Sequence, residues 1–119
     1  MSHCIALVGH CGVDGPRLQR EIRAQLADCE VLRINSTEDL ARCDADLLLV
    51  NREPVGFTEG GLALIRQLLK THPDCKVMLV SDYDDAQKQA VEAGALPGFG
   101  KAQFGDPSLV ETVRKALGD

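Results

Sequence analysis

Three short segments of the sequence are apolar at almost every position, and they restrict the possible folds more than any other feature. They are IALVG (5–9), DLLLVN (46–51) and KVMLVS (76–81). A strand with one face in solvent alternates apolar and polar residues, whereas a parallel strand covered by helices on both faces does not. EVLRIN (30–35) and the weaker LPGFGK (96–101) complete a set of five candidate strands. The pattern predicts a parallel sheet between two layers of helices.

Amphipathic segments separate these strands. Residues 15–28 predict a first helix, with Pro16 in its first turn. Their apolar face consists of residues at four-residue spacing: Leu18, Ile22 and Leu26. Residues 59–73 predict a second helix, which stops at Pro73. Its apolar face is expected to consist of Leu62, Ile65, Leu68 and Leu69.

Three further helices are expected at 36–43, 84–95 and 106–119, because capping residues mark their ends. These residues are Ser36 and Asp106 or Pro107 at starts, and Gly94 and Gly118 at ends. Strand–helix–strand crossovers are right-handed, so the alternation predicts an α/β, doubly wound, flavodoxin-like sheet of five parallel strands flanked by five helices. Residues 1–119 are long enough for one domain of this kind. The expected core includes Val8, Leu48, Val50, Ile65 and Leu79.

Composition excludes several classes of protein. With 45% apolar and 26% charged residues, the chain is globular rather than disordered. It contains no apolar run near the roughly 18 to 20 residues that span a bilayer, and its first residues lack the features of a signal peptide. The net charge is −5, and lysine and arginine are scattered along the sequence. We therefore expect a soluble, cytoplasmic protein that contacts neither membranes nor nucleic acid directly.

The five cysteines are odd in number and lack CxxC spacing, which argues against a disulfide framework or a zinc site. We expect them to be small buried hydrophobes. His3, Cys4, His10 and Cys11 do not suggest a metal site either, because a strand from Cys4 to His10 would hold its ends roughly 20 Å apart. No metal and no cofactor is predicted.

The predicted topology brings several polar residues together. The carboxyl ends of the first, third, fourth and fifth strands lie along one edge of such a sheet, where open α/β proteins bind ligands. The residues delivered to this edge are Gly9 and His10, Asn51, Ser81 and Lys101.

Over essentially its whole length the sequence resembles a response-regulator receiver domain of the CheY-like type. The resemblance rests on the fivefold alternation of strands and helices, on VMLVS ending at Ser81, and on EAGALPGFGK leading to Lys101. Pro54 and Gly61 are similar to the loop that follows the family's phosphoacceptor. In that family, two acidic residues after the first strand hold Mg²⁺, and an aspartate at the end of the third strand accepts phosphate. A Ser or Thr and a Lys complete the site.

The resemblance implies a degenerate site. Ser81 and Lys101 match the switch residues, but Asn51 occupies the phosphoacceptor position, and Gly9 and His10 replace the acidic pair. Ala102 also replaces the proline that usually follows the lysine. An amide is a poor nucleophile, and phosphoryl transfer needs a hard cation held by oxygen ligands. We therefore expect an atypical, non-enzymatic signalling module that is not phosphorylated by the standard aspartyl route.

Several hypotheses about this edge remain open. Asn51 either bridges Lys101 and Ser81 without a metal, or ends its strand and caps the turn at Pro54. Asp14 lies close enough in sequence to reach back as one ligand. We expect Asn51→Asp alone not to restore phosphorylation, and the further changes Gly9→Asp and His10→Asp to restore some of it.

Two hypotheses about function belong to different classes. The favoured one is a module that acts through protein contacts; the resemblance implies a homodimer or a protein partner at the fourth helix, fifth strand and fifth helix. The alternative is a small-ligand or nucleotide binder that uses the Gly9 to Gly15 loop and Lys101, because backbone N–H groups at a helix start can hold phosphate. Gly9, Gly12 and Gly15 do not have G-x-G-x-x-G spacing, so a loose turn is the favoured interpretation of the loop.

Overall fold

The computed structural model describes residues 3–118 and contains one five-stranded parallel sheet in the order β2-β1-β3-β4-β5. The strands are β1 (His3–Val8), β2 (Cys29–Ile34), β3 (Leu47–Asn51), β4 (Val77–Val80) and β5 (Leu96–Phe99). The helices are α1 (Asp14–Gln25), α2 (Thr37–Ala41), α3 (Gly61–Thr71), α4 (Asp84–Ala93) and α5 (Pro107–Ala116), with a short 3₁₀ turn at Lys101–Gln103. The predicted doubly wound, flavodoxin-like fold is confirmed.

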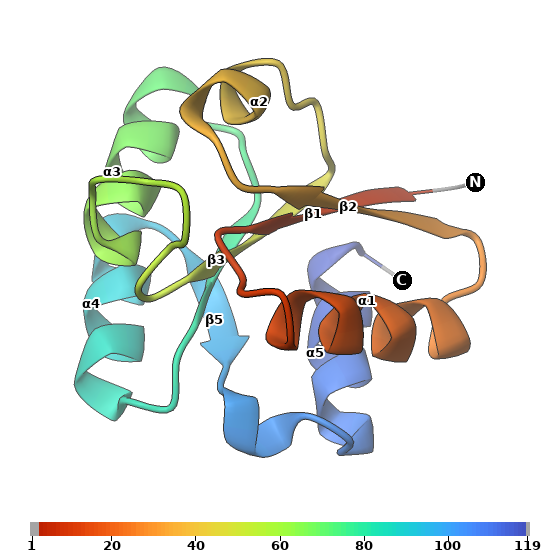
Figure 1. The fold of residues 1–119 in the computed structure, drawn as a ribbon. Coiled ribbons are helices and arrows are strands. Elements are labelled where there is room, and N and C mark those ends of the chain that lie inside the picture. The colour runs from red at the N-terminus through yellow and green to blue at the C-terminus, as the bar shows by residue number, and fades with distance from the viewer. Residues whose placement is uncertain (1–2, 119) are drawn as a thin grey trace.

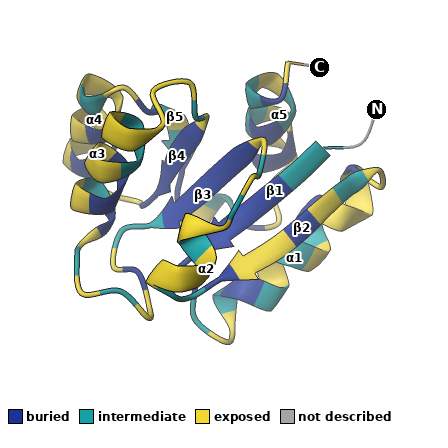
Figure 2. Ribbon diagram, turned by 90° about the horizontal axis from the view of Figure 1, so that it is seen from above, coloured by how far each residue is buried: buried dark blue, intermediate teal, exposed yellow. Residues whose placement is uncertain are grey.

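Helices cover both faces of the sheet (Figure 1). Helices α1 and α5 lie on one face, and α2, α3 and α4 lie on the other. Successive residues of a strand point to opposite faces of the sheet. Leu7 and Leu49 pack toward α1 and α5, whereas Val8 and Val50 pack toward α3 and α4. The central strands β1, β3 and β4 are almost wholly buried (Figure 2). This double burial explains why their sequences do not alternate.

The predicted core residues are all buried: Val8, Leu48, Val50, Ile65 and Leu79. The predicted caps are also confirmed. The Ser36 side chain accepts a hydrogen bond from the Asp39 N–H, and the Asp106 side chain accepts one from the Ser108 N–H. Gly94 ends α4 with φ of +113°, a conformation that glycine adopts at little cost.

The expected apolar face of α3 packs against the sheet. Ile65 is fully buried, and Leu62, Leu68 and Leu69 are half-buried against the same cluster. Leu64, which the expected face omitted, is also buried. One expectation about burial was wrong. The five cysteines are half-buried rather than buried, since they lie at strand ends and in loops. Within residues 3–118, no helix is long and apolar enough to cross a membrane.

Strand β5 is the weakest member of the sheet. It is an edge strand, and its pairing with β4 is irregular between Met78 and Val80. Pro97 lies within it, which is acceptable because an edge strand does not need every backbone N–H for pairing. The consequence for the site is that Lys101 follows a short edge strand and begins the 3₁₀ turn.

Candidate functional site

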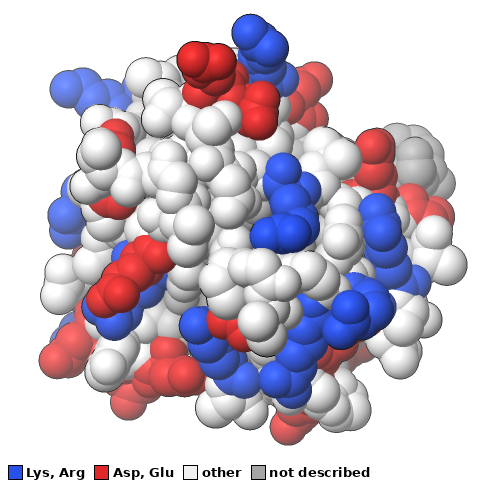
Figure 3. Space-filling view, in the orientation of Figure 1, with Lys and Arg blue, Asp and Glu red and all other residues white. Residues whose placement is uncertain are grey.

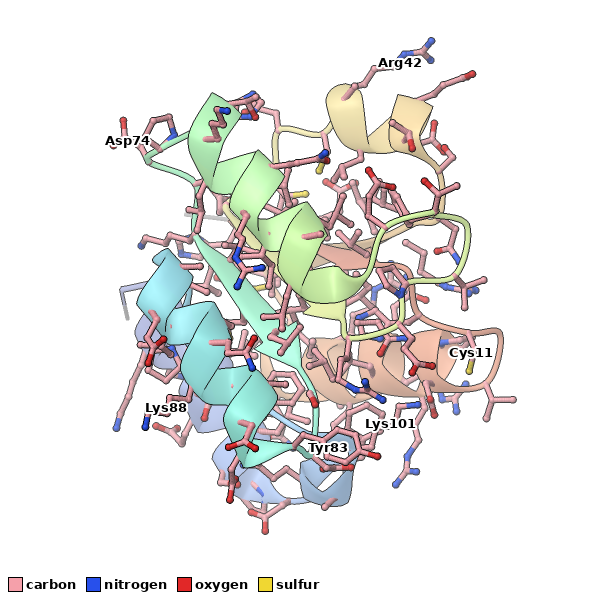
Figure 4. All side chains as sticks on the ribbon, turned by 90° about the vertical axis from the view of Figure 1, so that its left-hand side faces the viewer. Cys11, Arg42, Asp74, Tyr83, Lys88 and Lys101 are labelled. Carbon is pink, nitrogen blue, oxygen red and sulfur yellow. The ribbon has the colours of Figure 1, made fainter. Side chains whose placement is uncertain are left out.

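A pocket of about 480 Å³ lies at the carboxyl edge of the sheet. Asn51, Ser81 and Lys101 all line it, so the chain brings together three of the residues that the topology assigned to this edge. Figure 4 shows Lys101 and Tyr83 at this end of the molecule, with Cys11 on the neighbouring loop; Cys11 and Tyr83 also line the pocket. Gly9 and His10 lie beneath this surface and are described below.

Asn51 is held by the two loops that flank it. Its side-chain Nδ2 donates to the Gly9 carbonyl at 3.0 Å and to the Glu53 carbonyl at 3.2 Å. Within residues 3–118, no hydrogen bond joins Asn51 to Lys101 or Ser81. The hypothesis that Asn51 bridges those two residues was therefore wrong. Asn51 stabilises the turn before Pro54 and ties it to the end of β1, in agreement with the structural hypothesis.

Gly9 occupies a position that no other residue fits. Its φ is +75°, and a Cβ built on it would lie 2.3 Å from the Pro54 Cβ. Its N–H donates to the Ile34 carbonyl, and its own carbonyl accepts from the Val55 N–H, each at 2.8 Å. The expectation that Gly9→Asp would help to rebuild a cation site was wrong, because the backbone and Pro54 exclude any side chain here.

His10 is buried rather than presented to the pocket; its exposed fraction is 0%. Its Nε2 lies 2.9 Å from the Leu49 carbonyl oxygen. Because a carbonyl can only accept, Nε2 carries the proton, and Nδ1 has no hydrogen-bond partner within the described residues. Burial lowers the pKa of His10, so the imidazole is neutral at pH 7. An aspartate at this position would be a buried carboxylate, and so His10→Asp does not rebuild a cation site either.

Asp14, which the sequence suggested could reach back toward the strand ends, contacts Lys101. At the start of α1, its Oδ2 lies 2.6 Å from Lys101 Nζ. This hydrogen-bonded ion pair lowers the pKa of Asp14 and raises that of Lys101. The Asp14 side chain is 19% exposed and that of Lys101 is 49% exposed, so solvent screens part of the interaction. The pair joins the first helix to the segment that follows β5.

The two acidic residues that line the pocket, Glu53 and Asp82, also have partners. Glu53 forms an ion pair with Arg52 at 3.1 Å, and Asp82 accepts a hydrogen bond from the Ala102 N–H at 3.0 Å. The Arg52 guanidinium carbon lies 4.5 Å from the ring centre of Tyr83, a cation–π contact across the pocket mouth. Within residues 3–118, no group of three or more His, Cys, Asp or Glu side chains is arranged to hold a metal ion.

Ser81 has a structural partner of its own. The side chain is 8% exposed, and its Oγ accepts a hydrogen bond from the Tyr83 N–H at 3.1 Å. The Ser81 carbonyl accepts from Gln87 of α4. Ser81 therefore fixes the turn between β4 and α4 while its hydroxyl remains at the pocket wall.

Internal contacts hold both ends of the glycine loop. The Gly9 and Gly15 N–H groups donate to the Ile34 and Cys11 carbonyls, and the Asp14 N–H donates to Cys11 Sγ at 3.3 Å. Arg33 donates to two carbonyls of the same loop. A phosphate at this loop would compete with these contacts and with Asp14, which is paired with Lys101.

Basic residues are less scattered in space than in sequence. Figure 3 shows lysine and arginine side chains gathered on the face over α1, which contributes Arg17, Arg20 and Arg23 at three-residue spacing. The sequence-based expectation of scattered charge was wrong for this face. Arg17 lies 5.3 Å from the Phe104 ring centre and Arg23 donates to the Val31 carbonyl. The net charge of −5 is then the one property that still disfavours direct binding of nucleic acid.

The fold is shared with solved receiver domains over the whole chain. A response regulator from Thermotoga maritima superposes with a TM-score of 0.81 at 23% identity, and all of both chains is covered. The receiver domain of NtrX from Brucella abortus gives 0.77 at 20% identity, covering 97% of this chain and 98% of that one. The signal receiver domain of a DNA binding response regulator from Colwellia psychrerythraea gives 0.79 at 16% identity, covering 99% and 100%. No protein-family model and no curated protein matches the sequence.

Proposed function

We propose that this chain, whose fold is that of a response-regulator receiver domain, is a signalling module that acts through protein contacts without aspartyl phosphorylation and without enzymatic activity of its own. The observation that carries the proposal is the environment of Asn51. Its amide donates to two backbone carbonyls, a role that a carboxylate cannot perform. The residue at the phosphoacceptor position is therefore part of the local structure.

The charges of the site support the same proposal. Lys101 has its counter-ion in Asp14, and Glu53 has its own in Arg52. Phosphoryl transfer depends on a cation placed against the phosphoryl oxygens, and the two positions that would hold it are a glycine without room for a side chain and a buried neutral histidine. Because these charges are already paired within the chain, we propose that the contact surface is presented constitutively, without a phosphate to change it.

The proposed contact surface consists of α4, β5 and α5. Val91 on α4 is 44% exposed, and β5 is an open edge with a hollow of about 300 Å³ beside α5. Helix α4 carries three carboxylates and one lysine, net −2, whereas α5 carries one glutamate and two cations, net +1. A twofold arrangement that sets α4 of one copy against α5 of another is electrostatically favourable, so we propose a homodimer.

A small-ligand binder remains the second candidate because the pocket of about 480 Å³ leaves room for one beside Lys101 and Arg52. One experiment separates the two candidates: two-dimensional ¹⁵N NMR of the chain at rising concentration, and then with Mg²⁺ and nucleotides. The homodimer predicts concentration-dependent shifts in α4, β5 and α5, with none at the pocket on adding nucleotide.

The matched variants are Val91→Asp, which should abolish the concentration dependence, and Val13→Asp, which should retain it. Val13 is 76% exposed on the loop before α1, away from the proposed surface. Specific shifts of pocket residues with nucleotide would favour the second candidate. Spectra independent of concentration would count against the homodimer.

A further inference from the structure

Four of the five cysteines lie at the amino end of the sheet, opposite the pocket. Cys29 begins β2 and packs on the side of α1 and α5. The other three are Cys43, which follows α2, Cys75, which precedes β4, and Cys4, which lies in β1. In Figure 4 the chain neighbours Arg42 and Asp74 mark this end of the molecule, far from Lys101. All three cysteines belong to the side of the sheet covered by α2, α3 and α4: Cys4 has the register of Ala6 and Val8, and Cys43 and Cys75 pack against the same cluster as those residues.

Cys43 and Cys75 share a cavity. A pocket of about 460 Å³ opens between the segment after α2 and the segment after α3, and both thiols line it. Its other walls are mixed: Leu40, Leu48 and Leu68 are among the apolar residues, and Asp44, His72 and Asp74 among the polar ones. Both cysteines are half-buried, so each is packed and also accessible to a small reagent. Cys4 does not line this pocket, which makes Cys75 the better partner for Cys43.

The electrostatics agree with this proximity. Burial raises the pKa of the Cys75 thiol, and a charge on Cys43 would raise it further. The same charge on Cys43 contributes to the raised pKa of Cys4. Because the thiolate is the nucleophile in disulfide exchange, a protonated Cys75 reacts slowly at neutral pH and faster as the pH rises.

We propose that Cys43 and Cys75 form an intramolecular disulfide when the chain meets a low-molecular-weight disulfide oxidant such as glutathione disulfide. One thiolate attacks the oxidant and releases one glutathione thiol. The second thiolate then attacks the mixed disulfide and releases the other glutathione. The two cysteines lose two electrons and two protons in total, and the two glutathione sulfurs gain them.

The bridge would tie the α2–β3 connection to the α3–β4 connection across the shared pocket. Cross-linking two segments that are distant in sequence restricts the unfolded chain more than the folded one, so the oxidised form should be more stable. This inference does not depend on the function proposed above, because the two thiols lie at the opposite end of the sheet from Asn51 and Lys101.

The test uses the full chain and glutathione disulfide at pH 8. After oxidation, remaining thiols are alkylated, and the chain is digested without reductant for mass spectrometry. We expect a linked peptide pair containing Cys43 and Cys75 in the wild type and in Cys29→Ser, a control on the other face of the sheet. The pair should be absent from Cys43→Ser and Cys75→Ser. Oxidation should raise Tm by about 5–10 °C in the first two proteins only, reversibly with dithiothreitol.

Three results would overturn the proposal. They are a main product that links Cys4 to Cys43, a product that links two chains, and glutathione adducts without any bridge. Far-UV circular dichroism of each reduced variant establishes that it is folded. The wild-type peptide map decides the question even if a serine variant is unstable.

Discussion

Replacing Gly9 by aspartate should lower the free energy of unfolding by about 2–5 kcal/mol, rather than create a ligand for a cation. The left-handed φ of +75° accounts for about 1–2 kcal/mol of this loss, because a Cβ crowds the following carbonyl in that conformation. The overlap with Pro54, at a built Cβ–Cβ distance of 2.3 Å, adds about 1–3 kcal/mol as the neighbouring turn is displaced. Gly9→Ala should lose nearly as much, since the cause is the Cβ atom and not the charge.

Gly12 provides the matched control in the same loop. A Cβ built on Gly12 meets no atom within 4 Å, and its φ lies outside the left-handed region. Gly12→Ala should therefore change the unfolding free energy by less than about 1 kcal/mol, with a small gain expected because alanine restricts the unfolded chain. Urea unfolding followed by circular dichroism measures all three variants. If Gly9→Ala were as stable as Gly12→Ala, Pro54 would not approach Gly9 closely enough to exclude a Cβ atom.

The second large effect is expected at His10. His10→Asp should lose about 3 kcal/mol or more at pH 7, because it would bury a carboxylate beside the Leu49 carbonyl without a paired cation. His10→Gln keeps an N–H that can donate to the same carbonyl, so its loss should be smaller. His10→Asn has the size of His10→Asp without its charge, so the comparison of these two variants separates the cost of the buried charge from the cost of lost packing.

The wild type should also respond to pH through His10. Burial lowers the pKa of His10 in the folded state. As the pH falls, the unfolded chain therefore binds a proton at His10 before the folded chain does. The stability contributed by neutral His10 is fully present above the pKa of the unfolded state, about 6.5, and is lost as the pH falls below that value. From pH 7.5 to 5.5, protonation of His10 should lower the free energy of unfolding of the wild type by up to about 1.4 kcal/mol. His10→Gln should not show this loss. Equal pH dependence of the two proteins, measured by urea unfolding, would contradict a buried neutral histidine.

The fold was predictable because the sequence carries the evidence locally. Segments such as 46–51 and 76–81 are apolar on both strand faces, and helix ends are marked by residues such as Ser36 and Gly94. Strand topology then brings Asn51, Ser81 and Lys101 to one pocket without any knowledge of side-chain contacts. These inferences depend on periodicity and on the handedness of crossovers, which short-range sequence patterns determine.

The contacts within the site were less predictable, because they depend on the path of the loops. Nothing in the sequence fixes the approach of Pro54 to Gly9, which closes that position to side chains. The same holds for the direction of His10, which packs beneath the surface, and for the pairing of Asp14 with Lys101. Asp14 lies five positions after Gly9, so the sequence suggests that its carboxylate can approach the strand ends. Which group it contacts depends on the conformation of the chain at the start of α1.

The contacts of Asn51 and the pairing of Lys101 with Asp14 support the expectation that Asn51→Asp alone does not restore phosphorylation. Asn51→Asp would remove an amide that donates to two carbonyls and would set a carboxylate against both oxygens. Lys101, which lines the same pocket, is already paired with Asp14. The variant should therefore be less stable than the wild type and still lack a cation site. If it nevertheless accepted phosphate, Asp14 would be the first residue to examine as the missing metal ligand.

Intact-mass spectrometry after incubation with acetyl phosphate and Mg²⁺ shows directly whether this chain accepts a phosphoryl group. The wild type and Asn51→Asp are treated alongside a receiver domain that retains its aspartate and acidic pair, which shows that the donor is active. We expect phosphorylation of that control and no added phosphoryl group on either form of this chain. The wild type lacks the nucleophile, and within residues 3–118 no group of carboxylates is arranged to hold Mg²⁺. A phosphoryl group on the wild-type chain would overturn the proposed function.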